Sequence, residues 1–127
     1  MDENHHSRLL EEIATEYKDV LENSEQGIYI YLDDTHKICN EKFSSLLGYD
    51  SPTEWAEVSE NFPTAFVDPK SQEVLINSYQ EAMEMCVGTK IEVTWKKKSG
   101  EPIESEVILV PVSNGGHLFA LHFVSTS

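Results

Sequence analysis

The spacing of apolar residues changes from helical to extended next to Gly88, and this change limits the chain to folds that pair helices with a sheet. Before Gly88, apolar residues recur every three or four positions: Val74, Leu75, Tyr79, Ala82, Met83 and Cys86. From Thr89 the interval becomes two, in "KIEVTWKKK", "IESEVILVPV" and "HLFALHFV". We therefore expect a helix followed by a three-stranded antiparallel meander, with turns at "SGE" and "SNGG".

The first half of the chain adds two further strands and a junction between strand and helix. "QGIYIYLDD" and "HKIC" are rich in β-branched and aromatic residues and are expected to form a hairpin. Helical spacing follows over residues 40–47, where Asn40 is expected to be the N-cap and to accept from the N–H of Lys42 or Phe43. Short helical turns are expected over residues 50–67. The order of elements predicts an α+β domain with these helices gathered on one face of the sheet.

Two longer helices are expected to have defined ends. Asp68 is expected to cap the long helix, which should end at Gly88. The segment 1–23 is predicted to be an amphipathic helix and linker that begins at Ser7, ahead of a single domain over residues 24–127. Its spacing suits both docking on its own domain and a short coiled-coil seam. The apolar stripe of this helix is formed by Leu10, Ile13, Tyr17, Val20 and Leu21.

Charge and composition exclude several classes of function. Nine Lys and Arg residues against 23 Asp and Glu residues give a net charge of −14, which repels nucleic acid and anionic membrane surfaces. The longest aliphatic run, "VILV", is far shorter than the roughly 20 residues of a membrane span, and the amino terminus lacks a signal-peptide pattern. A cytoplasmic location is therefore expected. Cys39 and Cys86 cannot form a disulfide framework, and both are expected to be free, buried thiols.

Four stretches, taken in order, resemble the PAS family of sensory domains. They are "LENSEQGIYIYLDD", "KICNEKFSSLLGY", "FVDP" and "KKKSGEPIESEVILVPV", within a similarity that runs from about Ser24 to Ser125. The resemblance implies a PAS-like (profilin-like) five-stranded antiparallel sheet with helices on one face. It also implies a small cavity between that face and the helices, used in many members for a ligand or cofactor. We expect the N-terminal helix, a partner subunit, or both to cover the opposite face.

Period-two alternation divides the strand residues between the two faces. The candidates for the ligand cavity, including one from the long helix, are Ile28, Ile30, Leu32, Tyr79, Trp95, Ser105, Val107, Leu109, Ala120, His122 and Val124. Candidates for the outer face and a dimer interface, including the helix stripe, are Leu10, Ile13, Tyr17, Val20, Leu21, Tyr29, Tyr31, Phe119, Leu121 and Phe123, with Ile108 and Val110 beside them.

His122 is the candidate with the most chemistry, because histidine titrates near neutrality and this one is expected to face the cavity. The alternatives are a contact with a ligand or a core histidine bonded to a backbone carbonyl. Ser105 could supply a second polar contact. Trp95 could be a stacking platform, although its bulk would also fill the cavity.

Known PAS cofactors fit the sequence poorly, so the cofactor is left unknown. Histidine-ligated haem in the family uses a histidine on the long helix, and no histidine lies between Lys37 and Gly116. Photoactive flavin members carry a reactive cysteine that "SENFPTAFVDP" lacks, and their flavin-binding asparagines fall at Trp95 and Ser105. No metal site is expected, because His5 and His6 lie near the terminus and Asp33, Asp34 and His36 are expected to shape a turn.

The sequence therefore predicts a sensory PAS module in signal transduction. It would bind a small molecule, relay a signal by dimerisation, or both, with an effector such as a sensor histidine kinase of a two-component system or a transcription regulator. The expected partners are a second copy, through the N-terminal helix and outer sheet face, and the effector. The alternative is a ligand-free dimerisation or interaction module whose cavity is filled by side chains. No catalytic motif is found, so an enzyme is not expected.

Overall fold

The computed structural model describes residues 2–33, 35–114 and 117–126. Asp34, and Gly115 and Gly116 of the expected "SNGG" turn, lie outside them. The helices are α1 (Asp2–Glu16), α2 (Lys18–Asn23), α3 (Glu41–Leu46), α4 (Pro52–Ala56), α5 (Phe62–Phe66) and α6 (Pro69–Met85). The strands are β1 (Gly27–Asp33), β2 (His36–Cys39), β3 (Thr89–Lys96), β4 (Pro102–Asn114) and β5 (His117–Thr126).

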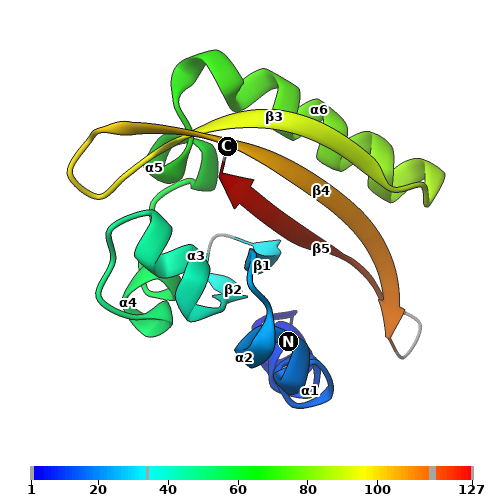
Figure 1. The fold of residues 1–127 in the computed structure, drawn as a ribbon. Helices are drawn as coiled ribbons and strands as arrows, with labels where there is room; N and C mark the ends of the chain where they lie inside the picture. The colour runs from blue at the N-terminus through cyan, green and yellow to red at the C-terminus, as the bar shows by residue number, and fades with distance from the viewer. Residues whose placement is uncertain (1, 34, 115–116, 127) are drawn as a thin grey trace.

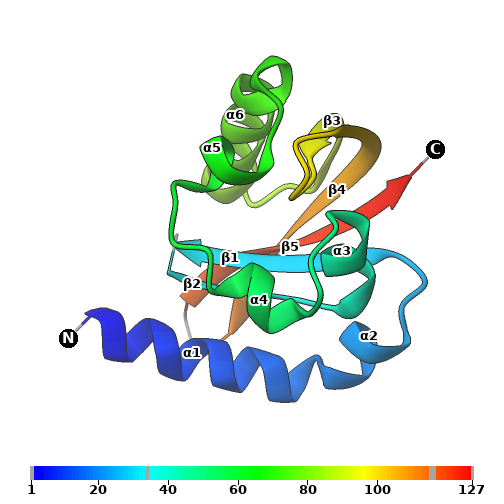
Figure 2. The ribbon, with the colours of Figure 1, turned by 90° about the vertical axis from the view of Figure 1, so that its left-hand side faces the viewer.

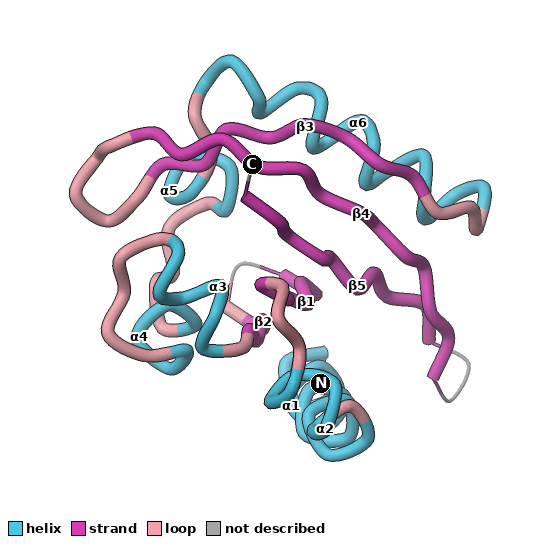
Figure 3. Tube along the Cα trace, viewed as in Figure 1, coloured by secondary structure: helices cyan, strands magenta, loops and turns pink. Residues whose placement is uncertain are grey.

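The five strands form one sheet in the order β2-β1-β5-β4-β3, and every neighbouring pair is antiparallel (Figure 1, Figure 3). The first and last strands in the chain, β1 and β5, therefore pair with each other in the middle of the sheet. Figure 2 shows α1 running along one face of this sheet while α5 and α6 lie on the other. The predicted five-stranded antiparallel α+β fold is confirmed, including an N-terminal helix on the outer face.

Two separate apolar clusters lie on the two faces of the sheet. The larger, which we call the helix-side core, joins the sheet to α3–α6 and is built around Phe43, Trp55, Phe66 and Trp95, each with no exposed surface. The smaller, the outer core, lies under α1 and contains Leu9, Ile13, Ile28, Ile30, Phe119 and Leu121. Each fully buried aliphatic or aromatic side chain contributes about 1.5–3 kcal/mol to folding, so both clusters stabilise the domain.

The amino-terminal segment departs from the single helix expected to begin at Ser7. Helix α1 begins at Asp2, and Tyr17 separates it from α2. Leu9, which was not assigned to the apolar stripe, is buried with Ile13 one helical turn later. Val20, which was assigned to the stripe, is 43% exposed.

Asn40 turns the chain from β2 into α3, and its contacts go beyond the expected cap. Its Oδ1 accepts from the N–H of Phe43 at 3.0 Å, as the sequence predicted. The same oxygen accepts from the N–H of Ile28 at 3.0 Å, and its Nδ2 donates to the carbonyl of Gln26 at 3.1 Å. The side chain therefore joins the start of β1 to the start of α3. At Gly27 in this junction, a Cβ would lie 3.1 Å from the backbone Cα of Phe43, so a larger residue would require a shift of a few tenths of an ångström.

The long helix begins where the sequence indicated and ends earlier. Asp68 caps α6 by accepting from the N–H of Lys70 at 3.1 Å. The helix ends at Met85, and Cys86 adopts the left-handed conformation with φ of 55°. A left-handed residue stops a helix whether or not it is glycine, so the end expected at Gly88 is wrong by one turn.

Candidate functional site

A pocket of about 270 Å³ opens between the sheet and helices α5 and α6. Its walls come from β1, β5 and the two helices, so they join segments far apart in the sequence. Aromatic rings belong to half of the lining residues, and amide side chains supply polar groups. The residues are Tyr29, Tyr31, Asn61, Phe62, Pro63, Leu75, Ile76, Tyr79, Gln80 and His122.

His122 is fully buried in the wall of this pocket and is held in its neutral form. Its Nδ1 lies 3.3 Å from the carbonyl oxygen of Tyr29, which can only accept, so Nδ1 carries the proton. Its ring stacks on the Tyr29 ring with centroids 4.0 Å apart and planes 8° apart. Burial lowers the pKa of His122 to about 3, against a smaller opposing effect of the Tyr29 and Ala120 carbonyls. The ring is therefore uncharged at neutral pH.

Two tyrosines of the pocket are also held neutral by burial. Burial raises the pKa of Tyr29 well above its ordinary value, and the nearby phenol of Tyr79 adds a smaller effect in the same direction. Burial likewise raises the pKa of Tyr79. Both phenols keep their protons at physiological pH and can donate or accept hydrogen bonds. The pocket thus offers neutral polar groups set in aromatic walls.

Only two of the predicted cavity candidates, Tyr79 and His122, line this pocket. Trp95 and Ser105 lie deeper in the helix-side core, where the Trp95 indole N–H donates to the Ser105 hydroxyl at 2.7 Å. That hydroxyl donates to the carbonyl of Val93 at 3.0 Å, so both polar groups are satisfied within the protein. The remaining β4 and β5 candidates are buried residues outside the pocket lining: Val107, Leu109, Ala120 and Val124.

The expected face of β1 is wrong. Ile28, Ile30 and Leu32, predicted to face the cavity, belong to the outer core under α1 or pack against it. Tyr29 and Tyr31, predicted for the outer face, point to the helix side and line the pocket. The pairing of β1 with β5 sets this phase, because Tyr29 lies opposite His122 and directly opposed residues share a face.

Several of the other outer-face candidates lie in the outer core or pack against it. Ile13 is fully buried in the outer core, and Tyr17 and Leu21 pack against it. On β5, Phe119 and Leu121 are buried there and Phe123 packs at its margin. Leu10 is partly buried and Ile108 is 36% exposed. The use of this surface in a dimer stays a prediction.

Sequence reasoning missed the pocket wall from α5 and, apart from Tyr79, the wall from the middle of α6. Phe62 stacks on Tyr29 with centroids 5.4 Å apart and meets the Tyr31 ring edge-on at 5.1 Å. Asn61 precedes it as the N-cap of α5, and its amide lies at the pocket. An Asn followed by Phe and Pro at a helix start was readable from the sequence as a cap. Its position across from β1 was not, since it depends on the path of the preceding loop.

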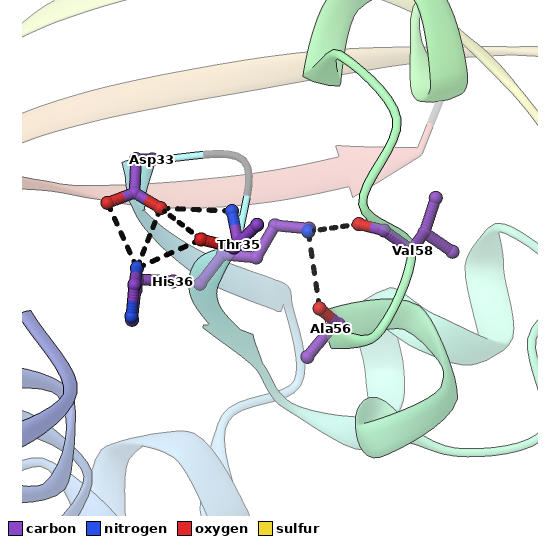
Figure 4. Close-up of polar contacts among 6 residues, drawn as sticks. Asp33, Thr35, His36, Ala56 and Val58 are labelled. Atoms are coloured by element: carbon purple, nitrogen blue, oxygen red, sulfur yellow. Dashed lines mark hydrogen bonds and ion pairs between the residues drawn. The ribbon is translucent and has the colours of Figure 1, made fainter. Parts of the chain in front are cut away.

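A polar cluster at the β1–β2 hairpin serves the fold (Figure 4). Asp33 accepts from the N–H of Thr35 at 2.9 Å, and its Oδ1 lies 2.8 Å from Nδ1 of His36. This is the turn geometry expected of an Asp here. Next to it, Lys37 is 2% exposed, and its ammonium donates to the carbonyls of Val58 at 2.6 Å and Ala56 at 3.2 Å. Lys37 thereby ties the segment after α4 to β2.

Other chemistry has limited support in the described part of the chain. Within it, no group of three or more His, Cys, Asp or Glu side chains could hold a metal ion; the side chains of His5 and His6 are not among those described. Cys39 is buried, and burial raises its pKa to about 12. Cys86, expected to be buried, is exposed because it follows the last turn of α6. None of the described helices has the length and apolar character needed to cross a bilayer.

Comparison with known proteins gives matches among solved structures alone. No protein-family model and no curated protein matches the chain. It is similar to the PAS domain of an HTR-like protein from Haloarcula marismortui, with 19% identity, a TM-score of 0.63 and coverage of 98% of this chain and 99% of that one. The PAS domain of a protein from Colwellia psychrerythraea gives a TM-score of 0.70 at 17% identity, covering 91% and 97%. That of nitrogen regulation protein NR(II) from Vibrio parahaemolyticus gives 0.63 at 17%, covering 85% and 94%.

Proposed function

Because the chain has the fold of a PAS domain, we propose that it is a sensory module in signal transduction. Residues 24–127 would form the sensory domain, with a small molecule bound in the pocket between β1, β5, α5 and α6. The N-terminal helices would pass the resulting change to an effector, such as a kinase or a transcription regulator. Solved structures of similar fold include a PAS domain from a two-component sensor histidine kinase and the N-terminal domain of a diguanylate cyclase.

The observation that carries this proposal is the alternation of side chains along β1. Tyr29 and Tyr31 line the pocket, while Ile28 and Ile30, between and beside them, pack under α1. A shift of β1 toward or away from a bound molecule therefore changes the packing beneath α1 directly. The coupling free energy can equal only the difference between the ligand's affinities for the two packings.

The output surface would be the outer face together with α1 and α2. Ile13 and Phe119 anchor α1 there, while Val20 and Ile108 keep exposed apolar surface next to it. A second copy of the chain docking on this surface would let a ligand-dependent shift of α1 alter the dimer. We propose no catalytic step, because the His122 ring meets a backbone carbonyl and the buried Cys39 thiol, with its pKa of about 12, stays protonated.

The test begins with the purified protein and a matched pair of variants. Native mass spectrometry and an absorption spectrum would reveal a retained molecule, and thermal shifts against a panel of metabolites would find weaker ones. Ile76→Trp adds bulk to the pocket wall from a side chain that is 39% exposed, whereas Val74→Trp makes the same change outside the pocket at a side chain 40% exposed. A true ligand should stabilise the wild type and Val74→Trp but not Ile76→Trp, and should change hydrogen exchange in α1.

A second candidate function is a ligand-free dimerisation or interaction module, and the packing of Trp95 favours it. Trp95 has no exposed surface and meets the rings of Tyr29 and Phe43 at 5.6 and 5.2 Å, so side chains fill the centre of the domain. Under this function no molecule would be retained or bound. Disrupting the outer face would abolish association, while Ile76→Trp would leave it intact.

A further inference from the structure

We propose that the pocket is built for an uncharged, planar aromatic molecule of one or two rings. This inference rests on the proposed sensory function and specifies the chemical class of the ligand. It follows from three properties of the pocket: its size, the orientation of its rings and the absence of charge from its described lining.

The size of the pocket limits the ligand to a small molecule. An apolar cavity of about 150 Å³ is enough to hold benzene, and this pocket measures about 270 Å³. The ratio of the two volumes is about 1.8, which corresponds to a fused two-ring compound or a substituted single ring. Nucleotides and flavins require several times the volume of one ring, so most of such a molecule would lie outside the pocket.

Ring orientation in the wall favours a flat molecule. The planes of His122 and Tyr29 differ by 8°, and those of His122 and Tyr79 by 12°, so three rings from β1, β5 and α6 are nearly parallel. Phe62 adds a fourth ring within 27° of Tyr29. A planar ligand parallel to these rings can stack on Tyr79, which is partly exposed, and can meet the Tyr31 ring, whose plane is 82° from that of Tyr79, edge-on. A puckered aliphatic ring of equal size cannot stack in this way.

The lining excludes a ligand that needs a counter-charge. It contains no Asp, Glu, Lys or Arg among the described residues, and its polar groups are phenols, amides and one imidazole. Burial lowers the pKa of His122 to about 3, so this ring offers no positive charge to an anion. A charge transferred into such a site without a partner pays the full cost of desolvation. The net charge of −14 adds long-range repulsion against anions.

Hydrogen bonds can still orient a neutral ligand. Tyr29 and Tyr79 carry phenols that keep their protons, and Asn61 and Gln80 bring amide donors and acceptors from α5 and α6. A hydroxyl, carbonyl or ring N–H on the ligand could meet one of them. The expected ligand thus has an aromatic body with one neutral polar group.

Four probes built on the same fused two-ring framework test the class on the full chain by isothermal titration. They are 2-naphthol, which is flat and neutral; 2-naphthoate, an anion; 2-(aminomethyl)naphthalene, a cation; and decahydro-2-naphthol, neutral but not flat. We expect 2-naphthol to bind at least about tenfold more tightly than each of the others. Its binding should be lost in Ile76→Trp and kept in Val74→Trp, since Ile76 lines the pocket and Val74 does not.

The outcomes separate the ligand class from the sensory function. If the cation bound as tightly as 2-naphthol, as cation–π attraction to the tyrosines would allow, the neutral class would be wrong. Equal binding of decahydro-2-naphthol would refute the planar requirement. A charged or aliphatic metabolite from the panel could bind the wild type but not Ile76→Trp. In that case the proposed ligand class would be wrong, whereas the sensory function would stand. If no probe or metabolite bound, both would fail.

Discussion

Acid should destabilise this protein through His122, and the effect can be isolated by replacing that one side chain. The ordinary pKa of histidine, 6.5, applies to the unfolded chain, whereas burial lowers the pKa of His122 in the folded protein to about 3. Between these two values the unfolded chain binds a proton that the folded protein does not. Stability therefore falls as the pH drops through this window and is fully restored above the unfolded value.

The size of the effect follows from the width of the window. Each pH unit below 6.5 costs 2.303RT, or about 1.36 kcal/mol, until the folded pKa is reached. From pH 6.5 to pH 5 the loss attributable to His122 is therefore about 2 kcal/mol. Acidic side chains titrate mainly below this range and are common to the wild type and any variant at position 122.

Chemical denaturation at pH 7, 6 and 5 measures the loss, with His122→Phe as the comparison. Phenylalanine keeps an aromatic ring next to Tyr29, which stacks on His122 at 4.0 Å, and removes the titration. The free energy of unfolding of the wild type should fall between pH 7 and pH 5 by about 2 kcal/mol more than that of the variant. His122→Asn serves if Phe proves too large. Parallel pH profiles would refute the reasoning, because they would mean that His122 accepts a proton in the folded protein.

Three further predictions test the packing away from the pocket. Ile13→Ala empties a fully buried position under α1 and should lower the free energy of unfolding by about 2–5 kcal/mol. Val20→Ala, at a side chain that is 43% exposed, should change that free energy by less than about 0.5 kcal/mol. Equal effects of the two substitutions in denaturant titrations would mean that α1 does not dock on the sheet. Lys37→Met leaves two carbonyl groups without their donor and should cost about 2 kcal/mol by the same assay; an unchanged midpoint would show that the buried ammonium contributes nothing net. In the native protein a thiol reagent at pH 8 should modify Cys86 at least about a hundredfold faster than Cys39, whose pKa burial raises to about 12; comparable rates of labelling, read by mass spectrometry, would contradict the burial of Cys39.

Where the sequence carried local physical constraints, the predictions were accurate. Asn40 and Asp68 cap α3 and α6 because their side-chain oxygens satisfy N–H groups that any helix start leaves free. The three-residue turn after β3 was readable from Gly100, which has a φ of 95° and lets the Lys97 N–H reach the Glu101 carbonyl at 2.8 Å. These features depend on a few neighbouring residues and on nothing distant.

The pocket depended on distant contacts and could not be predicted in the same way. Its walls join β1 and β5 to α5 and α6, and its volume is what remains after Trp95, Phe62 and Tyr29 have packed against one another. Period-two arithmetic says that His122 and Val124 share a face. It does not say which rotamers the aromatic rings adopt, and those rotamers decide whether the centre is hollow or filled.

The wrong face of β1 has a physical cause that also bears on function. Alternation identifies the buried side of a strand only when one side meets water, and β1 meets two apolar layers, the helix-side core through Tyr29 and the outer core through Ile28. Both sets of side chains are therefore apolar, and the phase of the strand is set by its pairing with β5, where Tyr29 lies opposite His122. The burial on both faces that hides the phase in the sequence also gives β1 pocket residues on one face and outer-core residues on the other, as β5 has with His122 and Leu121. A substitution that moved β1 by one residue would exchange the two sets, so the phase of this strand is a condition for the proposed coupling between pocket and helix.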